Sequence, residues 1–307
     1  TGMNVWKKMT REEAKRRGWK IIATRWIDVN KGDQDNPLYR SRLVGKEFND
    51  GGGEGLFAST PPLEALRMLV SDVATIEKPQ DKWEKVLMIN DISRAFFEAP
   101  MRRNVCVELP AEALTKEEKE RDMVGWLQMS LYGTRDAAAN FQEEVRKFMV
   151  GLGFTRGKYN ISTYHHKQRK MKVLIHGDDF VSSGRRCEAK WFKEELEKRF
   201  MVKTKIIGRS EEEEKEATVL NRSIRVTDRG WEYEADQRHA DIIIKELGLQ
   251  EAKGVSSPGE EEKIWKAEED AEVLKGGDDK RYRALAARAN YLALDRSDIQ
   301  YPVKEIC

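Results

Sequence analysis

Two adjacent carboxylates, Asp178 and Asp179, lie between two apolar runs of the chain. Residues 172–175 before them and 180–181 after them are typical of two strands joined by a tight turn. Carboxylates this close repel each other at neutral pH unless a cation lies beside them. A lone Asp-Asp pair is more often simply a good turn residue pair, so the pair alone does not establish a metal site.

A third acid, Asp91, ends the continuous apolar run 86–91, which is typical of a buried strand. If this strand and the hairpin of Asp178 and Asp179 are neighbours in one sheet, three carboxylates converge. Such a cluster suits two Mg²⁺ ions about 3.5–4 Å apart, because magnesium prefers oxygen ligands. The alternative interpretation is a soluble globular protein in which the three acids are structural.

A β-hairpin is predicted near the N-terminus, and its return strand carries Arg40, Arg42 and Lys46. Its predicted parts are strand 20–29, turn 31–37 and strand 39–44. Residues 1–48 hold twelve Lys/Arg against six Asp/Glu. This basic arm is compatible with a polyanion site and equally with a solvated surface.

The remaining pattern mixes helices and strands without regular alternation, which favours an α+β class. Thr10 is the predicted N-cap of the first helix, with Glu13 at the capping-box position. Predicted helices cover 10–17, 62–77, 137–152, 187–200, 236–247 and a region from 282. Predicted strands cover 86–91, the hairpin 172–181, and a strand–turn–strand at 218–233. A Gly-rich loop is predicted at 49–55 and an acidic linker at 257–280.

The bulk composition narrows the class of protein. With 307 residues, 39% hydrophobic and 36% charged, the chain is expected to be soluble and globular. Apolar stretches fall short of the roughly 20 residues of a membrane helix, so no membrane partner is expected. Three scattered cysteines predict neither disulfides nor a zinc site and favour a reducing compartment. The first residue is not Met and the last falls in a predicted helix, so we expect a segment of something longer.

Several stretches, in order along the chain, resemble the signatures of copia-type retrotransposon reverse transcriptases. Residues 39–48 resemble YKARLVAKGF and residues 57–61 resemble TFAPV. Residues 91–96 resemble DVKNAFL and residues 131–137 resemble LYGLKQA; 176–179 stand where YVDD would, and 291–299 resemble YLTNTRPDI. Each motif is weak alone, but this many in the same order make chance agreement improbable.

The resemblance implies an α+β right-hand polymerase fold with fingers, a palm built on an antiparallel sheet, and a thumb. The implied segments are 1–85 fingers, 86–122 palm with the first carboxylate strand, 123–160 template-side helix of fingers and palm, 161–230 palm with the His-Gly-Asp-Asp hairpin, 231–258 thumb, and 259–307 linker and start of a connection toward an RNase H domain.

The resemblance also implies roles for individual residues. Asp91, Asp178 and Asp179 would be the catalytic carboxylates and, with the carbonyl of Ile92, the metal ligands. The implied dNTP-binding residues are Arg40, Arg42, Lys46, Ile92, Phe96, Tyr132 and Gly133. Among these, Phe96 would exclude a 2′-hydroxyl, although the residues alone favour core packing over this role. Gly133 would allow a close backbone approach.

Template and primer contacts are implied for Arg135, His176 and Gly177. Three departures from the signatures bear on them. Asp136 replaces a Gln and is expected to bring negative charge toward the template, with Arg135 beside it as a counter-charge. His176 and Gly177 replace Tyr and Val, and Gly177 is expected to loosen the turn. Gly-Asp-Asp also occurs in RNA-dependent RNA polymerases, so the motif alone does not define template or product.

The function implied by the resemblance is RNA-directed DNA polymerisation with two Mg²⁺ ions, for which Mn²⁺ could substitute. The alternative is an inactive or domesticated relative that binds nucleic acid without polymerising. The implied partners are an RNA template, a DNA primer, dNTPs and the remainder of a Pol polyprotein (integrase and RNase H). The implied location is cytoplasmic, in a virus-like particle, with a nuclear phase as a further possibility.

Overall fold

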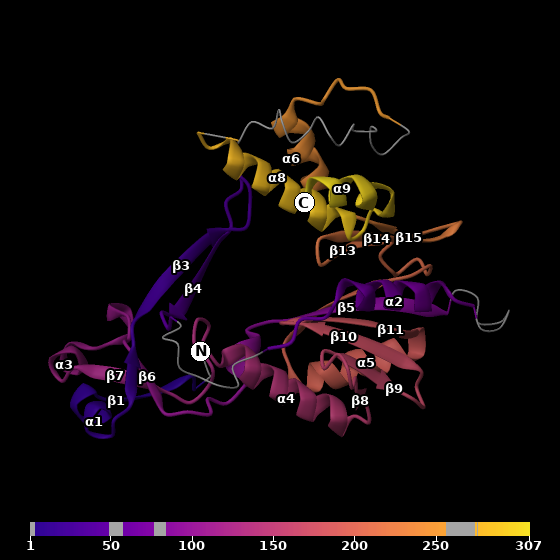
Figure 1. Ribbon diagram of the computed structural model, residues 1–307. Coiled ribbons are helices and arrows are strands. Elements are labelled where there is room, and N and C mark those ends of the chain that lie inside the picture. Colours follow the sequence, from indigo (N-terminus) through magenta and orange to yellow (C-terminus); the bar gives the residue numbers. More distant parts are fainter. Residues whose placement is uncertain (1–3, 49–57, 77–83, 256–273, 275) are drawn as a thin grey trace. The chain divides into compact units, whose positions relative to one another are not determined.

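The computed structural model of the chain describes residues 4–48, 58–76, 84–255, 274 and 276–307 (Figure 1). It divides into two compact units, residues 1–205 and 206–307. The division falls inside the segment 161–230 that the resemblance assigns to the palm, and the subdomain names remain predictions. The Gly-rich loop at 49–55 and most of the linker predicted at 257–280 lie outside the described residues.

A six-stranded sheet forms the centre of the first unit. Its order is β12 (Val202–Ile207), β5 (Lys85–Ile92), β11 (Asp179–Arg185), β10 (Met171–His176), β9 (Thr163–His166) and β8 (Thr155–Arg156). The pairs from β5 to β8 are antiparallel. β5 and β11 lie inside this sheet and are almost entirely buried, as the apolar runs predicted. The predicted α+β class with an antiparallel sheet is confirmed.

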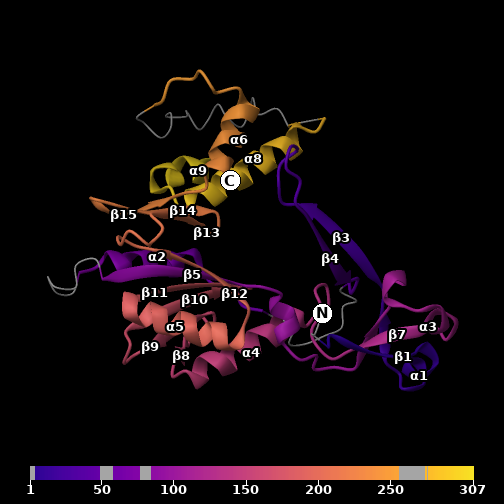
Figure 2. The same cartoon turned by 180° about the vertical axis from the view of Figure 1, so that it is seen from behind.

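Three helices cover the two faces of this sheet (Figures 1 and 2). They are α2 (Leu63–Ala74) on one face, and α4 (Ala137–Gly151) and α5 (Arg186–Arg199) on the other. Apolar side chains at helical spacing, among them Leu66 and Leu69 of α2, are buried. Asp72 of α2 accepts hydrogen bonds from Ser183 of β11 at 2.7 Å and from Lys172 of β10. α2 is therefore tied to both strands of the hairpin that carries Asp178.

A separate four-stranded sheet also belongs to the first unit. Its order is β1 (Trp6–Thr10), β7 (Met123–Leu127), β6 (Val105–Val107) and β2 (Lys20–Ile22). The short helices beside it are α1 (Arg11–Arg16), η2 (Ala95–Glu98), η3 (Ala111–Ala113) and α3 (Lys116–Glu120). Thr10 caps α1 by accepting a hydrogen bond from the Glu13 N–H at 3.3 Å, as predicted.

The predicted N-terminal hairpin is present as a separate two-stranded sheet. Its strands are β3 (Thr24–Asn30) and β4 (Tyr39–Gly45), paired from Thr24 opposite Gly45 to Asn30 opposite Tyr39. It extends as a long arm from the four-stranded sheet (Figure 1). Most of its residues are exposed, so contacts at its base must hold it in place.

The second unit combines a three-stranded sheet with helices. Its elements are β13 (Glu216–Val219), β14 (Arg222–Thr227), β15 (Gly230–Glu234), α6 (Gln237–Leu247), α8 (Asp278–Ala293), η4 (Ser297–Ile299) and α9 (Gln300–Ile306). The predicted strand–turn–strand is therefore three strands. The last helical region begins at Asp278, so residues 278–280 of the predicted linker are helical.

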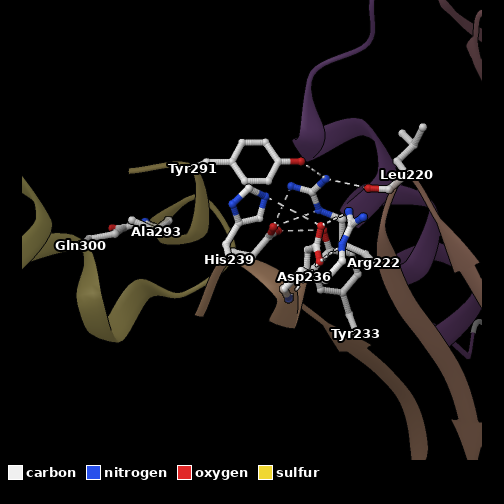
Figure 3. A network of polar contacts seen from close by, with 10 residues as sticks. Leu220, Arg222, Tyr233, Asp236, His239, Tyr291, Ala293 and Gln300 are labelled. Carbon is white, nitrogen blue, oxygen red and sulfur yellow. Dashed lines mark hydrogen bonds and ion pairs between the residues drawn. The ribbon is translucent and has the colours of Figure 1, made fainter. Parts of the chain in front are cut away.

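A buried ion pair fastens α8 to this small sheet (Figure 3). Arg222 of β14 donates to Asp295 at 3.0 Å and to the hydroxyl of Tyr291 at 2.6 Å. Tyr233 of β15 donates to the same carboxylate at 2.8 Å. These four residues all belong to the second unit, where their contacts join the sheet to the C-terminal end of α8. None of the helices in the described part of the chain is long and apolar enough to cross a membrane.

Candidate active site

The pairing register of β5 and β11 places Asp91 directly opposite Asp179. Directly opposed residues of an antiparallel pair project from the same face of the sheet, with Cβ atoms about 4.5–5.5 Å apart. Asp91 is exposed and Asp179 is partly buried. The sequence left open whether these two strands are neighbours, and the structure pairs them directly.

Asp178 reaches the same place through the turn between β10 and β11. His176 pairs with Asp179, so Gly177 and Asp178 form a two-residue turn. Gly177 has φ of 63°, and glycine in the first central position is typical of a type II′ hairpin turn. The backbone carbonyl of Asp178 accepts a hydrogen bond from the Ile92 N–H at 3.0 Å. The turn is thus anchored to the end of β5.

Gly177 was expected to loosen this turn, and the backbone argues otherwise. A Cβ at Gly177 would meet nothing within 4 Å, so space is not the constraint. The positive φ is the constraint, since a β-branched residue there would be strained. Glycine therefore fits the observed turn without strain, but it provides no side chain next to Asp178 and Asp179.

The three carboxylates influence one another electrostatically. Burial raises the pKa of Asp179 to about 6, and the charges of Asp178 and Asp91 act in the same direction. His176 opposes this shift. Asp179 therefore lies in a negative field that a cation would relieve.

The donor atoms are those of a magnesium site. Carboxylate oxygens of Asp91, Asp178 and Asp179 and the carbonyl of Ile92 are hard ligands of the kind that Mg²⁺ selects. Within the described residues, however, no three Asp, Glu, His or Cys side chains are oriented as a ready coordination cluster. The strands that carry the three aspartates are neighbours. The like-charged side chains of these aspartates are not oriented toward one common position. The chemistry of the set fits the metal.

Tyr132 lies next to these acids and to the arm. Burial raises the pKa of its hydroxyl and the charge of Asp178 raises it further, whereas Arg42 and Arg40 act in the opposite direction. The Arg42 guanidinium lies 5.5 Å from the centre of the Tyr132 ring. The Phe96 ring also packs against the Tyr132 ring, with 4.5 Å between the two ring centres. Residues far apart in sequence thus meet around one aromatic side chain.

A cavity of about 740 Å³ opens beside this group, between the arm and the four-stranded sheet. Among the described residues of its lining, three are arginines, Arg40, Arg42 and Arg94, and one is an acid, Glu112. Trp6, Trp26, Phe97 and Tyr132 provide aromatic surface. Basic and aromatic groups together suit the phosphates and rings of a nucleotide. The three candidate carboxylates lie outside this lining.

Arg94 is a residue of this cavity that the sequence patterns did not single out. It has φ of 60°, in the left-handed region that non-glycine residues seldom adopt. It initiates η2, which carries Phe96. Strained backbone of this kind clusters at functional sites. Arg94 follows Asp91 by three residues, but its left-handed φ, which is the signal, can be seen only in the structure.

Gly133 was expected to allow a close backbone approach beneath the template and nucleotide, and in the structure the backbone that it approaches is that of the arm. It has φ of 81°, and a Cβ there would come within 2.1 Å of the Gly45 carbonyl oxygen. Gly45 N–H donates to the Tyr132 carbonyl at 2.7 Å. Lys46, just after β4, donates its N–H to Ala23 at 2.8 Å, and its side chain is exposed.

Asp136 does not carry its charge toward the template as expected. Its side chain is buried and accepts hydrogen bonds from Arg103 at 2.9 Å and Asn140 at 3.1 Å. Arg103 is a counter-charge of Asp136. Arg135 donates its backbone N–H to Glu47 at 3.0 Å. The sequence patterns missed Glu47 and Arg103, because their partners are distant in sequence.

Two solved structures illustrate what the chain is similar to. A solved foamy viral protease-reverse transcriptase in complex with double-stranded DNA is similar with a TM-score of 0.41 and 12% identity, over 95% of this chain and 45% of that one. The apo telomerase of Candida tropicalis is similar with a TM-score of 0.35 and 14% identity, over 55% of this chain and 35% of that one. The chain thus spans less than half the length of either. A comparison with curated proteins found no match.

A family model gives the assignment. The model described as reverse transcriptase (RNA-dependent DNA polymerase) matches residues 4–210, about two thirds of the chain. The matched range contains β5, β10, β11, the arm and Tyr132. The chain therefore belongs to the reverse transcriptase (RNA-dependent DNA polymerase) family.

Proposed function

We propose that the protein is the RNA-directed DNA polymerase of a copia-type retrotransposon, which adds dNTPs to the 3′-hydroxyl of a primer. The observation that carries the proposal is the register of Asp91 opposite Asp179, with Asp178 in the adjoining turn. It occurs inside the range that matches the reverse transcriptase family. The copia assignment rests on the ordered motifs around these acids.

Asp91, Asp178 and Asp179, with the Ile92 carbonyl, would hold Mg²⁺ or Mn²⁺. Two such ions supply activation of the attacking hydroxyl and stabilisation of the leaving pyrophosphate. The chain itself contributes a negative field that attracts cations: after burial, the charges of Asp178 and Asp91 are what raise the pKa of Asp179. It also contributes a rigid base, since β5 and β11 are buried inside the sheet.

The arm and the aromatic group would bind the incoming nucleotide. Arg40 and Arg42 line the cavity beside Tyr132 and can fork onto phosphate oxygens. Lys46 adds a cation at the base of the arm. Phe96 packs against Tyr132, and we propose that its flat ring lies under the sugar of the nucleotide.

Template and primer would bind mainly through their backbones. An A-like hybrid presents phosphates and 2′-hydroxyls, so binding is expected to be sequence-independent and salt-sensitive. Arg135, His176 and Gly177 are proposed contacts. As a retrotransposon polymerase, the protein would act beside integrase and RNase H of a Pol polyprotein, in a cytoplasmic virus-like particle with a possible nuclear phase.

Primer extension on poly(rA)/oligo(dT) with dTTP and Mg²⁺ tests the proposal. Extension is expected from the wild type and is expected to stop with EDTA or with Asp178→Asn. Asp228→Asn is the matched control, because it makes the same chemical change at an exposed turn between β14 and β15. This control should extend the primer at the wild-type rate.

The outcome that overturns the proposal is tight binding of the hybrid without extension. That result would favour an inactive or domesticated nucleic-acid-binding relative. A fluorescence anisotropy titration of the labelled hybrid distinguishes this case from a preparation that binds nothing.

A further inference from the structure

Glu47 is a buried carboxylate at the base of the arm, two residues after β4. Its side chain is 1% exposed. Arg103 donates to both of its oxygens, one at 2.8 Å, and Lys20 lies 3.3 Å away. The Arg135 backbone N–H donates to it at 3.0 Å. One carboxylate therefore joins β2, the loop before β6, and the segment before α4.

Arg103 bridges two buried acids. It is paired with Glu47 on one side and with Asp136, at the N-terminus of α4, on the other. Burial alone acts to raise the pKa of Glu47, but hydrogen bonds from Arg103 and the Arg135 N–H outweigh it and lower that pKa to about 2. Hydrogen bonds from Arg103 to Glu47 and to Asp136 raise the pKa of Arg103, against the effect of its burial. We call these three residues the Glu47–Arg103–Asp136 cluster.

Two of its members depart from the family signatures. Glu47 stands at the Gly of YKARLVAKGF, and Asp136 stands at the Gln of LYGLKQA. Each departure alone adds a buried negative charge, which is costly without a partner. Both acids meet the same guanidinium, so the two departures have one common explanation in the structure.

The cluster is placed where it determines the direction of the arm. The arm is a two-stranded sheet with mostly exposed residues, and such a hairpin is not stable in one orientation by itself. Glu47 N–H donates to Gly133 at 3.4 Å and Gly45 N–H to Tyr132 at 2.7 Å, so the backbone contacts sit at the same base. Arg40 lies seven residues along the strand from Glu47, roughly 23 Å of extended chain. A small rotation at the base therefore becomes a large displacement at Arg40.

We propose that the Glu47–Arg103–Asp136 cluster positions the arm so that Arg40 and Arg42 face Tyr132 and bind the triphosphate. This inference rests on the proposed polymerase function. The three residues of the cluster are positioning residues, because their role is to join the base of the arm to α4 and not to bind the nucleotide. The charge pair binds the base of the arm to the segment that carries Tyr132.

Arg103→Met and Arg103→Lys, made in the full chain, test the inference by two independent readouts. The first is hydrogen exchange of the amides in residues 24–45, which needs no activity. The second is the KM for dTTP compared with kcat in primer extension. Arg11→Met is the matched control, because Arg11 also bridges two acids, Glu108 and Asp122, but at the surface.

Arg103→Met is expected to raise exchange in β3 and β4 while leaving β10 and β11 unchanged. It should raise the KM for dTTP about tenfold with little change in kcat, because misplacement weakens binding more than chemistry. Arg103→Lys should recover part of both effects, since it keeps the charge but loses the fork. Arg11→Met should change neither.

Unchanged exchange in the arm of Arg103→Met overturns the inference, and so does a uniform rise over the first unit, which indicates a general structural role. If Arg103→Met does not fold, Glu47→Gln replaces it with a milder, isosteric change and the same two expectations. A wild type that does not extend primers refutes the proposed function, and the exchange of the arm then still decides whether the cluster holds it.

Discussion

Two groups of carboxylates in the first unit differ in what surrounds them. Glu47 and Asp136 share the guanidinium of Arg103, and the pKa of Glu47 falls to about 2. Asp91, Asp178 and Asp179 face one another, and the pKa of Asp179 rises to about 6. Both Glu47 and Asp179 are removed from water in part, so burial acts on both in the same direction. The sign of the neighbouring charge decides the outcome.

The difference separates acids that hold the fold from acids that are available for chemistry. A carboxylate with a complete set of donors is stabilised as an anion and has nothing left to bind. A carboxylate among like charges is destabilised, and the fold must supply the energy that keeps it there. In this protein the second group lies at the end of buried strands, which can bear that cost.

The largest expected effect lies in the uncompensated group. Asp91→Asn should lower the rate of single-nucleotide addition about a thousandfold, because an amide loses the charge that the reaction uses. Its free energy of unfolding should stay equal or rise, since a like charge opposite Asp179 is removed. Rapid-quench primer extension and urea denaturation measure the two quantities. A rate near that of Asp228→Asn would contradict the assignment.

The opposite pattern is expected in the compensated group. Arg103→Met should lower the free energy of unfolding by about 3 kcal/mol, because Glu47 and Asp136 are left buried without a cation. Arg11→Met should cost under about 1 kcal/mol, since its acid partners are exposed. Urea denaturation followed by tryptophan fluorescence compares them. Equal losses would remove the distinction between the two bridges.

The pH dependence of Glu47→Gln sharpens the comparison. Because the pKa of Glu47 is lowered from 4.5 to about 2, its ionised form stabilises the fold above pH 4.5 and loses that contribution as pH falls toward 2. Glu47→Gln should therefore be less stable than the wild type by about 2 kcal/mol at pH 7. The gap should narrow below pH 4.5 in urea denaturation at several pH values. A gap that persists to pH 2.5 would show that charge is not the cause.

Phe96 lies beside Tyr132, which touches both regions. Phe96→Val should reduce discrimination against ribonucleotides about tenfold or more, because the ring no longer excludes a 2′-hydroxyl. Competition between dTTP and UTP on one template measures the ratio. Phe141→Val is the control, since Phe141 packs edge-on against the Phe96 ring and does not line the cavity. Unchanged sugar selectivity in Phe96→Val would assign that residue to core packing.

The smallest expected effect has the reverse sign. The pKa of Asp179 is raised from 3.8 to about 6, so ionisation costs stability above pH 6 and the cost disappears below about 3.8. Asp179→Asn should gain about 1 kcal/mol at pH 7 after solvent screening, and nothing at pH 4. Thermal unfolding at both pH values measures the gain. A loss of stability at pH 7 would mean that Asp179 has a structural partner.

Family membership confirms the resemblance found in the sequence and the right-hand polymerase class that it implied. The apolar runs before Asp91 and around Asp178 predicted buried strands correctly, because a strand buried on both faces is uninterrupted by polar residues. The arm was also predictable, since its turn is rich in Gly, Asp, Asn and Pro. Such signals come from residues adjacent in sequence, so they can be interpreted without knowledge of the fold.

Which acid pairs with which cation could not be predicted from the sequence in the same way. Glu47 and Arg103 are 56 residues apart, and Arg103 and Asp136 are 33 apart. Sequence shows that an acid is present but not which cation folds against it. Asp136 was accordingly assigned to the template side, whereas the structure buries it against Arg103.

The amino-acid sequence by itself determined the elements, the positions of the three aspartates at strand ends, and the family. Only the tertiary structure decided that Asp91 stands opposite Asp179, that Gly133 meets Gly45, and which acids are neutralised. The physical reason is range. Hydrophobic periodicity and turn chemistry act over a few residues, whereas strand register and the field at a carboxylate depend on residues that only folding brings together.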